Sequence, residues 1–375
     1  MLTPEASLSA FFDHAPYALE KARKLALLGP HLQHLKTWHE AKCPDYAALS
    51  QMQDQMLAAL TPANLSPAEQ LELTLPLVHV QLFKLFGLKS ISDAEIYKTM
   101  TSSGTSGQAV SRIYLDQATA ILQSKALGHI MADFLGQKRR TMLIIDSKAV
   151  LKDPKMFSAR GAGILGMMPF GRGHTYALDD NYELNLELML DFLQQHQAEP
   201  LLLFGFTFMV WQNLVQKLKP VLKERGLSLN LSNAVLIHAG GWKKMQQMAV
   251  DNDTFKAQLR QVLGSELKVH NFYGMVEQTG SVYMECEVGH LHVSNFSDLI
   301  IRDPLTYRPL GFNQVGVIET ISALPLSYPG FALLTEDLGQ IFGEDDCPCG
   351  RKGKYFQVHG RIPKAEVRGC SDVYN

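Results

Sequence analysis

Thr101–Gly107 (TSSGTSG) is the first segment whose residue types could bind a phosphate. Glycines let a backbone turn its N–H groups toward an anion, and hydroxyl side chains add hydrogen-bond donors. The segment is not a Walker A loop, because Gly107 is followed by Gln108 rather than by Lys and Ser/Thr. A flexible connection is the alternative interpretation. The candidate phosphate-binding residues are Thr101, Ser102, Ser103, Gly104, Thr105, Ser106 and Gly107.

A second segment, Phe272–Gly280 (FYGMVEQTG), begins at the end of an expected strand. Ligand crevices of open α/β sheets form at the carboxyl ends of the strands. Tyr273 could stack on a nucleotide base there, and Glu277 could bind Mg²⁺ through a carboxylate oxygen. The alternative is an ordinary strand-to-helix turn with an exposed glutamate.

Two later segments add a carboxylate and a guanidinium. Asp337 in Leu333–Gly339 (LLTEDLG) could accept hydrogen bonds from two ribose hydroxyls. Arg361 in Val358–Gly369 could meet a phosphate or a ribose with its planar set of donors. Each of these signals is weak in isolation.

The cysteines suggest two further kinds of chemistry. Cys286, Cys347 and Cys349, with His290 or His292, would form a Cys₃His zinc site if they converge. The Cys-x-Cys spacing is shorter than that of the common zinc knuckle, so reduced buried cysteines remain the alternative.

Cys370, in the segment RGCSD, could act as a nucleophile once it is a thiolate. Its neighbour Arg368 favours the thiolate, whereas Asp372 opposes it unless the two charges pair. The alternative is an inert cysteine in a frayed terminus.

The elements that position these residues change character along the chain. Apolar residues three and four apart, as in Ala18–Leu28 and Tyr46–Leu60, predict a helical segment over residues 1–92. From Met100 onward, strand-like and helix-like runs alternate, which is typical of a parallel sheet in an α/β fold. The expected strands are Thr141–Asp146, Leu201–Phe206, Ala234–His238 and Leu267–Tyr273, and the expected helices are Asp116–Gly136, Tyr182–His196, Phe208–Leu218 and Met245–Leu263.

After Gly280 the pattern changes to short strands with Gly/Pro turns, such as Val315–Ile321 and Ala332–Thr335. It predicts a small β-rich subdomain, and the last thirty-five residues, rich in Gly, Cys and charge, are expected to form loops. We therefore expect four parts: 1–92, helical; 93–280, the α/β nucleotide- and acyl-binding core; 281–342, β-rich; and 343–375, a Cys-rich loop and tail.

Composition excludes several classes of protein. A formal charge of −2 without a basic block argues against nucleic-acid binding. The first residues lack the features of a signal peptide, and Leu201–Val210, the longest apolar run, is too short to span a bilayer. Five cysteines do not indicate a disulfide framework, so we expect a reduced, cytoplasmic setting.

The order of the motifs is more specific than any one of them. The hydroxyl-rich loop, His238–Trp242 (HAGGW), YGMVE, TEDLG and GR together resemble the core motifs of the adenylate-forming superfamily, which includes acyl-CoA ligases and firefly luciferase. Within it, the chain is most similar to the LuxE family, the acyl-protein synthetases of bacterial fatty-acid reductase complexes. The segments that carry this resemblance are Ser158–Gly171, Phe204–Trp211, HAGGWKK, Gly343–Arg361 and Ala365–Asp372.

The resemblance implies a role for each matching residue. The Thr101–Gly107 loop would close over the ATP phosphates, and Glu277 would bind Mg²⁺. Gly240 and Gly241 would line the adenine site, and Tyr273 would stack near the adenine. Gly274 would also belong to the nucleotide site, Asp337 would hold the ribose, and Arg361 would lie near the ribose or phosphate. Cys370 would accept the acyl group. Related phenylacetate-CoA ligase-like enzymes carry a similar Cys/His arrangement, which favours His292 over His290 as the fourth zinc ligand.

The sequence departs from the wider superfamily in two places. The usual lysine after the phosphate loop is missing, and only fourteen residues follow Arg361, so we expect no mobile C-terminal domain with its catalytic lysine. Lys364 or Arg368 could instead supply the positive charge that stabilises the transition state.

The expected reaction is ATP-dependent activation of a carboxylic acid, expected to be a long-chain fatty acid, as its acyl-adenylate. Transfer to Cys370 and then to a reductase or another acceptor protein would follow. The alternatives are an acyl- or aryl-CoA ligase that uses free CoA, and a non-catalytic scaffold subunit.

Overall fold

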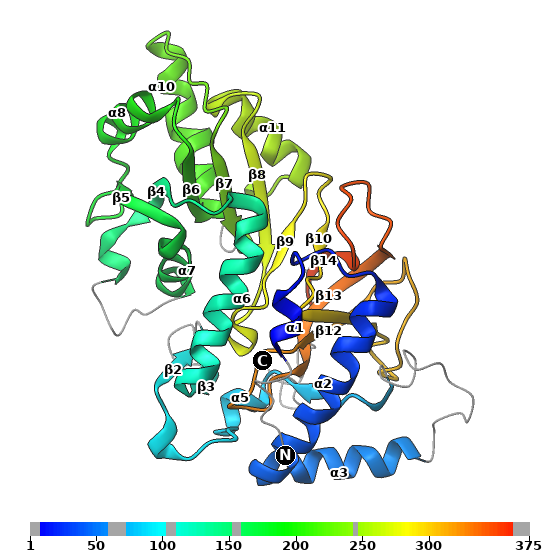
Figure 1. Ribbon diagram of the computed structural model, residues 1–375. Helices are drawn as coiled ribbons and strands as arrows, with labels where there is room; N and C mark the ends of the chain where they lie inside the picture. The colour runs from blue at the N-terminus through cyan, green and yellow to red at the C-terminus, as the bar shows by residue number, and fades with distance from the viewer. Residues whose placement is uncertain (1–7, 59–72, 103–109, 152–158, 243–246, 363–375) are drawn as a thin grey trace, which may run out of the picture.

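The computed structural model describes residues 8–58, 73–102, 110–151, 159–242 and 247–362. This part of the chain is a mixed α/β fold built around one twelve-stranded sheet, in which eleven strands follow the order β11-β12-β13-β14-β10-β9-β8-β7-β6-β4-β5 and β1 pairs with β13. Figure 1 shows the helices α8 and α10 gathered near the β4–β7 end of the molecule, with α2 and α3 at the opposite end near β12.

The parallel half of the sheet contains the strands expected from the apolar runs. Its strands are β4 (Arg140–Ser147), β5 (Gly171–Leu178), β6 (Leu201–Phe206), β7 (Val235–Ala239) and β8 (Lys268–Tyr273). Every residue of β6 and β7 is buried, as expected for central strands covered on both faces. The neighbouring β7 and β8 run in register, with Val235 opposite Lys268 and Ala239 opposite Phe272.

Helices connect these strands. They are α6 (Gln117–Leu135), α7 (Ala159–Met167), α8 (Leu186–His196), α9 (Thr207–Val210), a π-helical segment (Trp211–Leu218), α10 (Lys219–Glu224) and α11 (Asn252–Leu263), with short 3₁₀ turns at Lys148–Leu151 and Met168–Phe170. The expected helix limits at Asp116 and Gly136 are confirmed. The Asp116 carboxylate accepts a hydrogen bond from the Thr119 N–H at 2.8 Å, and Gly136 ends the helix with φ of +77°.

Antiparallel strands continue the same sheet beyond β8. They are β9 (Tyr283–Glu285), β10 (Leu291–His292), β11 (Ser297–Arg302), β12 (Gly316–Ser322), β13 (Ala332–Glu344) and β14 (Lys354–Arg361). A small core that includes Tyr283, Leu299, Ile318 and Phe356 packs here, separate from the main core. A two-stranded hairpin, β2 (Lys98–Thr101) with β3 (Arg112–Leu115), stands outside the large sheet.

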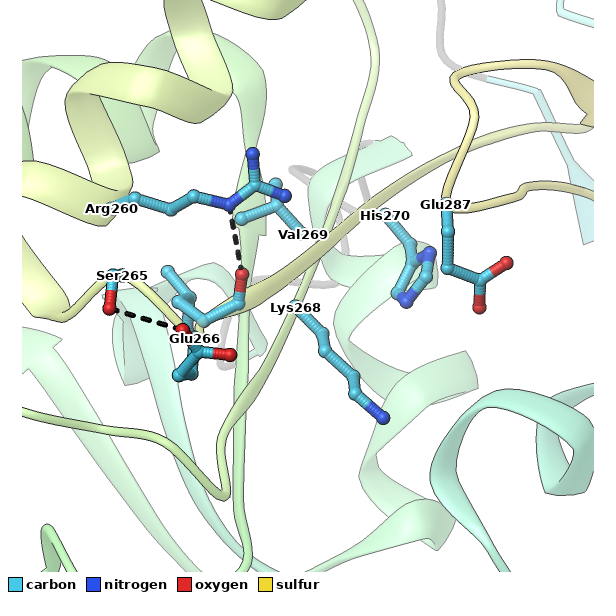
Figure 2. Close-up of a pocket in the computed structure, with 8 residues that line it drawn as sticks. Arg260, Ser265, Glu266, Lys268, Val269, His270 and Glu287 are labelled. Atoms are coloured by element: carbon cyan, nitrogen blue, oxygen red, sulfur yellow. Dashed lines mark hydrogen bonds between the residues drawn. The ribbon is translucent and has the colours of Figure 1, made fainter. Parts of the chain in front are cut away.

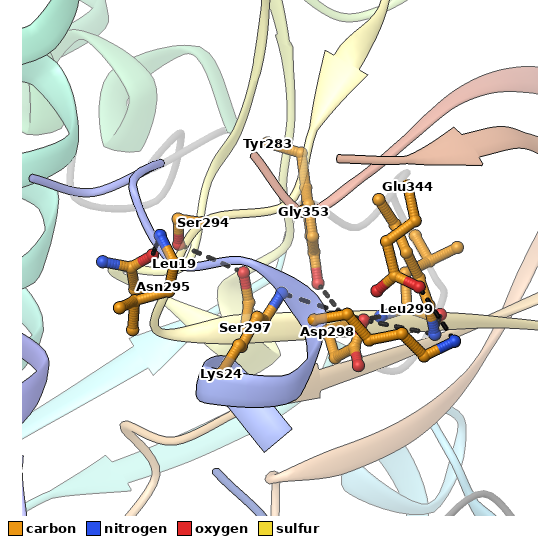
Figure 3. A network of polar contacts seen from close by, with 12 residues as sticks. Leu19, Lys24, Tyr283, Ser294, Asn295, Ser297, Asp298, Leu299, Glu344 and Gly353 are labelled. Atoms are coloured by element: carbon orange, nitrogen blue, oxygen red, sulfur yellow. Dashed lines mark hydrogen bonds and ion pairs between the residues drawn. The ribbon is translucent and has the colours of Figure 1, made fainter. Parts of the chain in front are cut away.

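The described N-terminal residues form a mostly helical layer. Its elements are α1 (Ser9–Phe12), α2 (Lys21–Lys42), α3 (Pro44–Ala58), the short strand β1 (Val78–His79), α5 (Leu82–Leu85) and a 3₁₀ turn (Asp93–Glu95). Helix α2 is joined to the antiparallel half by the buried charges in Figure 3. The Asp298 carboxylate lies 3.4 Å from the Lys354 ammonium and 3.9 Å from the Lys24 ammonium. Burial alone would raise the pKa of Asp298, but the two ammonium groups hold it below its usual range.

Three expected segments are wrong in part. Residues Lys354–Arg361 form strand β14 rather than a loop, because they pair with the extended strand β13. Met245 lies outside the described residues, and the described part of the helix expected from there begins only at Asn252, where the Asp251 carboxylate accepts from the Thr254 N–H at 2.8 Å. The helix expected from Tyr182 begins at Leu186, after the cap Asn185. In both cases a side-chain cap places the start of the helix at a later residue than the spacing of apolar residues suggests.

Within the described residues, no helix combines the length and the apolar character needed to cross a bilayer.

Candidate active site

A tyrosine, an aspartate and an arginine meet beyond the carboxyl end of β8. The Tyr273 hydroxyl donates to Asp337 Oδ2 at 2.7 Å, and Arg361 Nε lies 3.8 Å from Asp337 Oδ1. Strand pairing brings this about, because Asp337 of β13 lies directly opposite Arg361 of β14. Burial, together with the Asp337 charge, raises the pKa of Tyr273, so its hydroxyl remains a proton donor that orients the carboxylate.

Exposure differs among these three groups. The Arg361 side chain is 79% exposed, so a ligand can reach it, whereas the Asp337 side chain is 21% exposed. The Tyr273 ring packs against Tyr283 and Phe356. A hydrogen-bonded carboxylate next to an exposed guanidinium can bind the hydroxyl groups of a sugar close to an anion.

Glu277 lies in the 3₁₀ turn Val276–Gln278 that follows β8. The residue is only 4% exposed, so the interpretation as an exposed turn glutamate is wrong. Burial raises the pKa of Glu277, and the nearby Ser111 side chain offsets part of this rise. Among the described residues, no Lys, Arg or His nitrogen lies within 4.0 Å of this carboxylate. A buried carboxylate without a cationic partner can bind a metal ion.

The β2–β3 hairpin lies beside Glu277, because Ser111 immediately precedes β3. Thr101 ends β2, and the next residue, Ser102, pairs with Ser111. Ser102 Oγ accepts from the Ser111 N–H at 2.9 Å, and the Ser102 N–H donates to the Ser111 carbonyl at 3.1 Å. The structure thus brings the base of the hydroxyl-rich loop to Glu277. Ser103, Gly104, Thr105, Ser106 and Gly107 lie outside the described residues, as do Lys364 and Cys370.

Gly240 and Gly241 follow β7, the strand next to β8, and both are exposed. Gly240 has φ of +75°, a conformation that favours glycine. The Thr207 hydroxyl donates to the Gly240 carbonyl at 2.5 Å and lies 2.9 Å from His238 Nδ1. The sequence analysis did not predict a role for Thr207 at this edge of the sheet. The sequence feature that could have indicated it is the position of Thr207 directly after the buried strand β6. Gly274, also exposed, follows Tyr273 at the same edge of the sheet.

A second cluster contains three cysteines and a histidine. The ligand atoms of Cys286, His292, Cys347 and Cys349 all lie within 4.8 Å of one another. Cys286 follows β9, His292 belongs to β10, and the other two cysteines lie between β13 and β14, so pairing of these strands unites segments far apart in sequence. His292, rather than His290, completes this set, with its Nε2 3.3 Å from Cys349 Sγ. Burial raises the pKa of Cys347 to about 12 and lowers that of His292 to about 4.

A surface depression of about 330 Å³ lies elsewhere (Figure 2), lined by Arg260, Ser265, Glu266, Leu267, Lys268, Val269, His270 and Glu287. Lys268 begins β8, whereas Tyr273 ends it, so the depression faces the amino edge of the parallel strands. Arg260 Nε is already engaged by the Leu267 carbonyl at 3.3 Å. We assign no part of the candidate active site to this depression, because ligands of parallel sheets bind at the carboxyl ends.

Comparison with known proteins supplies the family. Residues 63–375 match the family described as "Acyl-protein synthetase, LuxE". The chain belongs to the LuxE family. It is a ligase of the acyl-protein synthetase class.

This LuxE-family chain resembles two proteins that bear the name long-chain-fatty-acid–luciferin-component ligase. The protein from Vibrio harveyi is 24% identical over 314 residues, which cover 79% of this chain and 76% of that protein. The protein from Aliivibrio fischeri is 25% identical over 153 residues, which cover 40% of this chain and 40% of that protein.

Solved structures confirm the adenylate-forming fold. An open conformation of 2-hydroxyisobutyryl-CoA ligase, in complex with 2-HIB-AMP and CoA, superposes with a TM-score of 0.65. It is 16% identical in sequence, and the match covers 93% of this chain and 77% of that one. At this identity the similarity concerns the fold.

Proposed function

We propose that this protein uses ATP to activate a long-chain fatty acid as its acyl-adenylate. The observation that supports this most directly is the convergence of Asp337, Tyr273 and Arg361 with the buried Glu277 at one edge of the sheet. LuxE membership and the names of the two Vibrio-group relatives support the ligase chemistry and the class of acid.

The residues at this edge of the sheet would contact different parts of ATP. The Asp337 carboxylate, oriented by Tyr273, accepts hydrogen bonds from the ribose hydroxyls of ATP, and the exposed Arg361 contacts ribose or phosphate. The exposed backbone at Gly240, Gly241 and Gly274 leaves room for the adenine. The loop from Thr101 to Gly107 supplies N–H and hydroxyl donors to the phosphates.

The adenylation step exchanges one phosphorus–oxygen bond for another. A carboxylate oxygen of the fatty acid attacks the α-phosphorus of ATP, and the bond to the pyrophosphate oxygen breaks. Bound Mg²⁺ would neutralise charge on the phosphates. Glu277 fits such an ion, because its buried carboxylate has no cation within ion-pair distance among the described residues. Lys364 is our candidate for an additional cation.

In the second step, we propose that Cys370 receives the acyl group. The thiolate sulfur attacks the acyl carbon, the carbon–oxygen bond to AMP breaks, and the proton of the thiol passes to solvent or buffer. The thioester is then passed to a thiol of a reductase or another acceptor protein.

We also propose that Cys286, His292, Cys347 and Cys349 bind a structural zinc ion. Zinc–sulfur bonds of about 2.3 Å in a tetrahedral site place sulfur atoms roughly 3.8 Å apart, which fits ligand atoms within 4.8 Å of one another. The ion would join the β9–β10 turn to the β13–β14 connection.

The deciding experiment compares Cys370→Ser with wild type in a first turnover with radiolabelled fatty acid. We expect the variant to release pyrophosphate in an acid-dependent way but to carry no hydroxylamine-sensitive label, because adenylation does not need the thiolate. The matched control, Cys43→Ala, removes a buried thiol from the helical layer and should label normally.

Three results would contradict parts of this proposal. Hydroxylamine-sensitive label on Cys370→Ser would exclude Cys370 as the acceptor. Acyl-CoA formation without any protein label in wild type would favour a CoA ligase. Failure of wild type to release pyrophosphate with any of a panel of carboxylic acids would favour a scaffold subunit.

A further inference from the structure

The connection between β12 and β13 runs through the interior of the protein. All residues from Ala323 to Gly330 are buried. Helix α2 covers this segment. His31 Nε2 lies 2.8 Å from the Ala323 carbonyl, and the Trp38 indole N–H donates to the Leu326 carbonyl at 3.0 Å. A buried connection must have its backbone polar groups paired, and these side chains provide part of that pairing.

Tyr328, within this connection, reaches the turn that carries Glu277. Its hydroxyl donates to the backbone carbonyl of Glu277 at 2.9 Å and accepts from Gln123 Nε2 of α6 at 3.2 Å. The Tyr328 oxygen already accepts a hydrogen bond from the Gln123 amide. The single proton of the hydroxyl therefore points to the Glu277 carbonyl. Burial raises the pKa of Tyr328, which keeps this proton in place.

Two glycines permit this close approach. A Cβ on Gly330 would lie 2.3 Å from Cε2 of Tyr328 and 3.0 Å from the Glu277 carbonyl oxygen. A Cβ on Gly280, three residues after Glu277, would lie 2.6 Å from the Gln123 carbonyl oxygen. The turn is therefore packed between the buried connection and α6, with no space for a side chain at either glycine.

The next residue of the turn is held in the same way. The side-chain amide of Gln278 donates to the carbonyls of Thr320 and Gly330, at 3.0 and 2.8 Å. Buried hydrogen bonds thus hold the carbonyl of Glu277 and the side chain of the residue after it, and the Ser111 side chain lies near the Glu277 carboxylate.

We propose that Tyr328 is a positioning residue that sets the place of the Glu277 carboxylate for the divalent cation. The inference rests on the proposed role of Glu277 as a ligand of Mg²⁺. Tyr328 itself touches neither ATP nor the acid. Tyr328 acts through the backbone carbonyl of Glu277. Loss of the Tyr328 hydroxyl should therefore change the Mg²⁺ dependence of the enzyme before it changes any other property.

The test measures, for wild type and Tyr328→Phe, the Mg²⁺ dependence of ATP binding by calorimetry without the acid and the Mg²⁺ dependence of acid-dependent ATP–pyrophosphate exchange. We expect the half-saturating Mg²⁺ concentration to rise about three- to tenfold, the range that corresponds to one lost hydrogen bond of ordinary strength. The matched control, Tyr46→Phe, removes an equally buried hydroxyl from α3 and should leave the Mg²⁺ dependence unchanged.

A second variant keeps the test available if Tyr328→Phe does not fold. Gln123→Met removes the partner that orients the Tyr328 hydroxyl and should shift the Mg²⁺ dependence in the same direction, by a smaller factor. A wild-type Mg²⁺ dependence in Tyr328→Phe, or in Gln123→Met where only that variant folds, would overturn the positioning role.

Glu277→Gln separates the two ideas. If Glu277→Gln loses exchange while Tyr328→Phe behaves like Tyr46→Phe, only the positioning role is wrong. If Glu277→Gln keeps wild-type exchange at every Mg²⁺ concentration, the proposed role of Glu277 is wrong, and the inference about Tyr328 falls with it.

Discussion

Asp337 is the residue on which the proposed nucleotide site most depends. Its carboxylate is oriented by the Tyr273 hydroxyl and lies near an exposed arginine, which leaves acceptor capacity for a ligand. Asp337→Ala should lower the affinity for ATP by roughly 10²-fold or more, because two hydrogen bonds to a charged acceptor would be lost. Isothermal titration calorimetry with ATP measures this directly.

The control for this prediction is Asp303→Ala, which removes a carboxylate from the surface turn after β11. It should bind ATP as wild type does. Unchanged affinity in Asp337→Ala would show that the ribose is held elsewhere.

At the scale of elements, the connections β9–β10 and β13–β14 meet at the proposed zinc site. We expect about one zinc ion per chain in protein purified without an affinity tag, and none in Cys347→Ser. Removal of the metal with a chelator should lower the midpoint of thermal unfolding, because the ion would join segments that are remote in sequence. Metal analysis and calorimetry check both.

Cys43→Ala is the appropriate control, since Cys43 lies between α2 and α3 and outside the cluster. Its zinc content should equal that of wild type. Wild-type protein that contains no zinc would rule out the assignment, and the four residues would then be a buried, reduced cluster.

At the scale of the whole molecule, the helical layer should make stability depend on pH. His39 of α2 is fully buried, with Nδ1 2.7 Å from Ser90 Oγ and Nε2 3.1 Å from the Pro325 carbonyl. Burial lowers its pKa from 6.5 to about 3. At pH values between 3 and 6.5, the unfolded chain binds a proton at His39 and the folded protein does not. The contribution of neutral His39 to stability is therefore full above pH 6.5 and is lost as the pH falls below it.

The expected loss can be measured by comparison with His39→Gln. The variant should be less stable at pH 7.5, and the difference in unfolding free energy should shrink by about 2 kcal/mol between pH 7.5 and pH 5. Chemical denaturation at both pH values measures it. His359→Gln, which removes an exposed imidazole from β14, is the control; a difference between wild type and His39→Gln that does not change with pH would contradict the assignment.

Local patterns in the sequence determined much of the parallel half of the fold. The run Leu201–Phe206 forms β6 with the expected limits, and the helix between Asp116 and Gly136 begins and ends where its cap and its glycine predict. These features depend on neighbouring residues, through apolar burial, capping and glycine conformation. The order of the short motifs likewise sufficed to identify the family.

Only the tertiary structure decided which distant residues share the site. The segment Lys354–Arg361 resembled a loop because glycines and charges obscure its pattern, yet pairing with β13 makes it a strand and places Arg361 opposite Asp337. Tyr328 carried no sequence signal of its own, because its bonds to Glu277 and Gln123 cross 51 and 205 positions of the chain. Such contacts are set by how the strands and helices pack, which no local pattern of residues records.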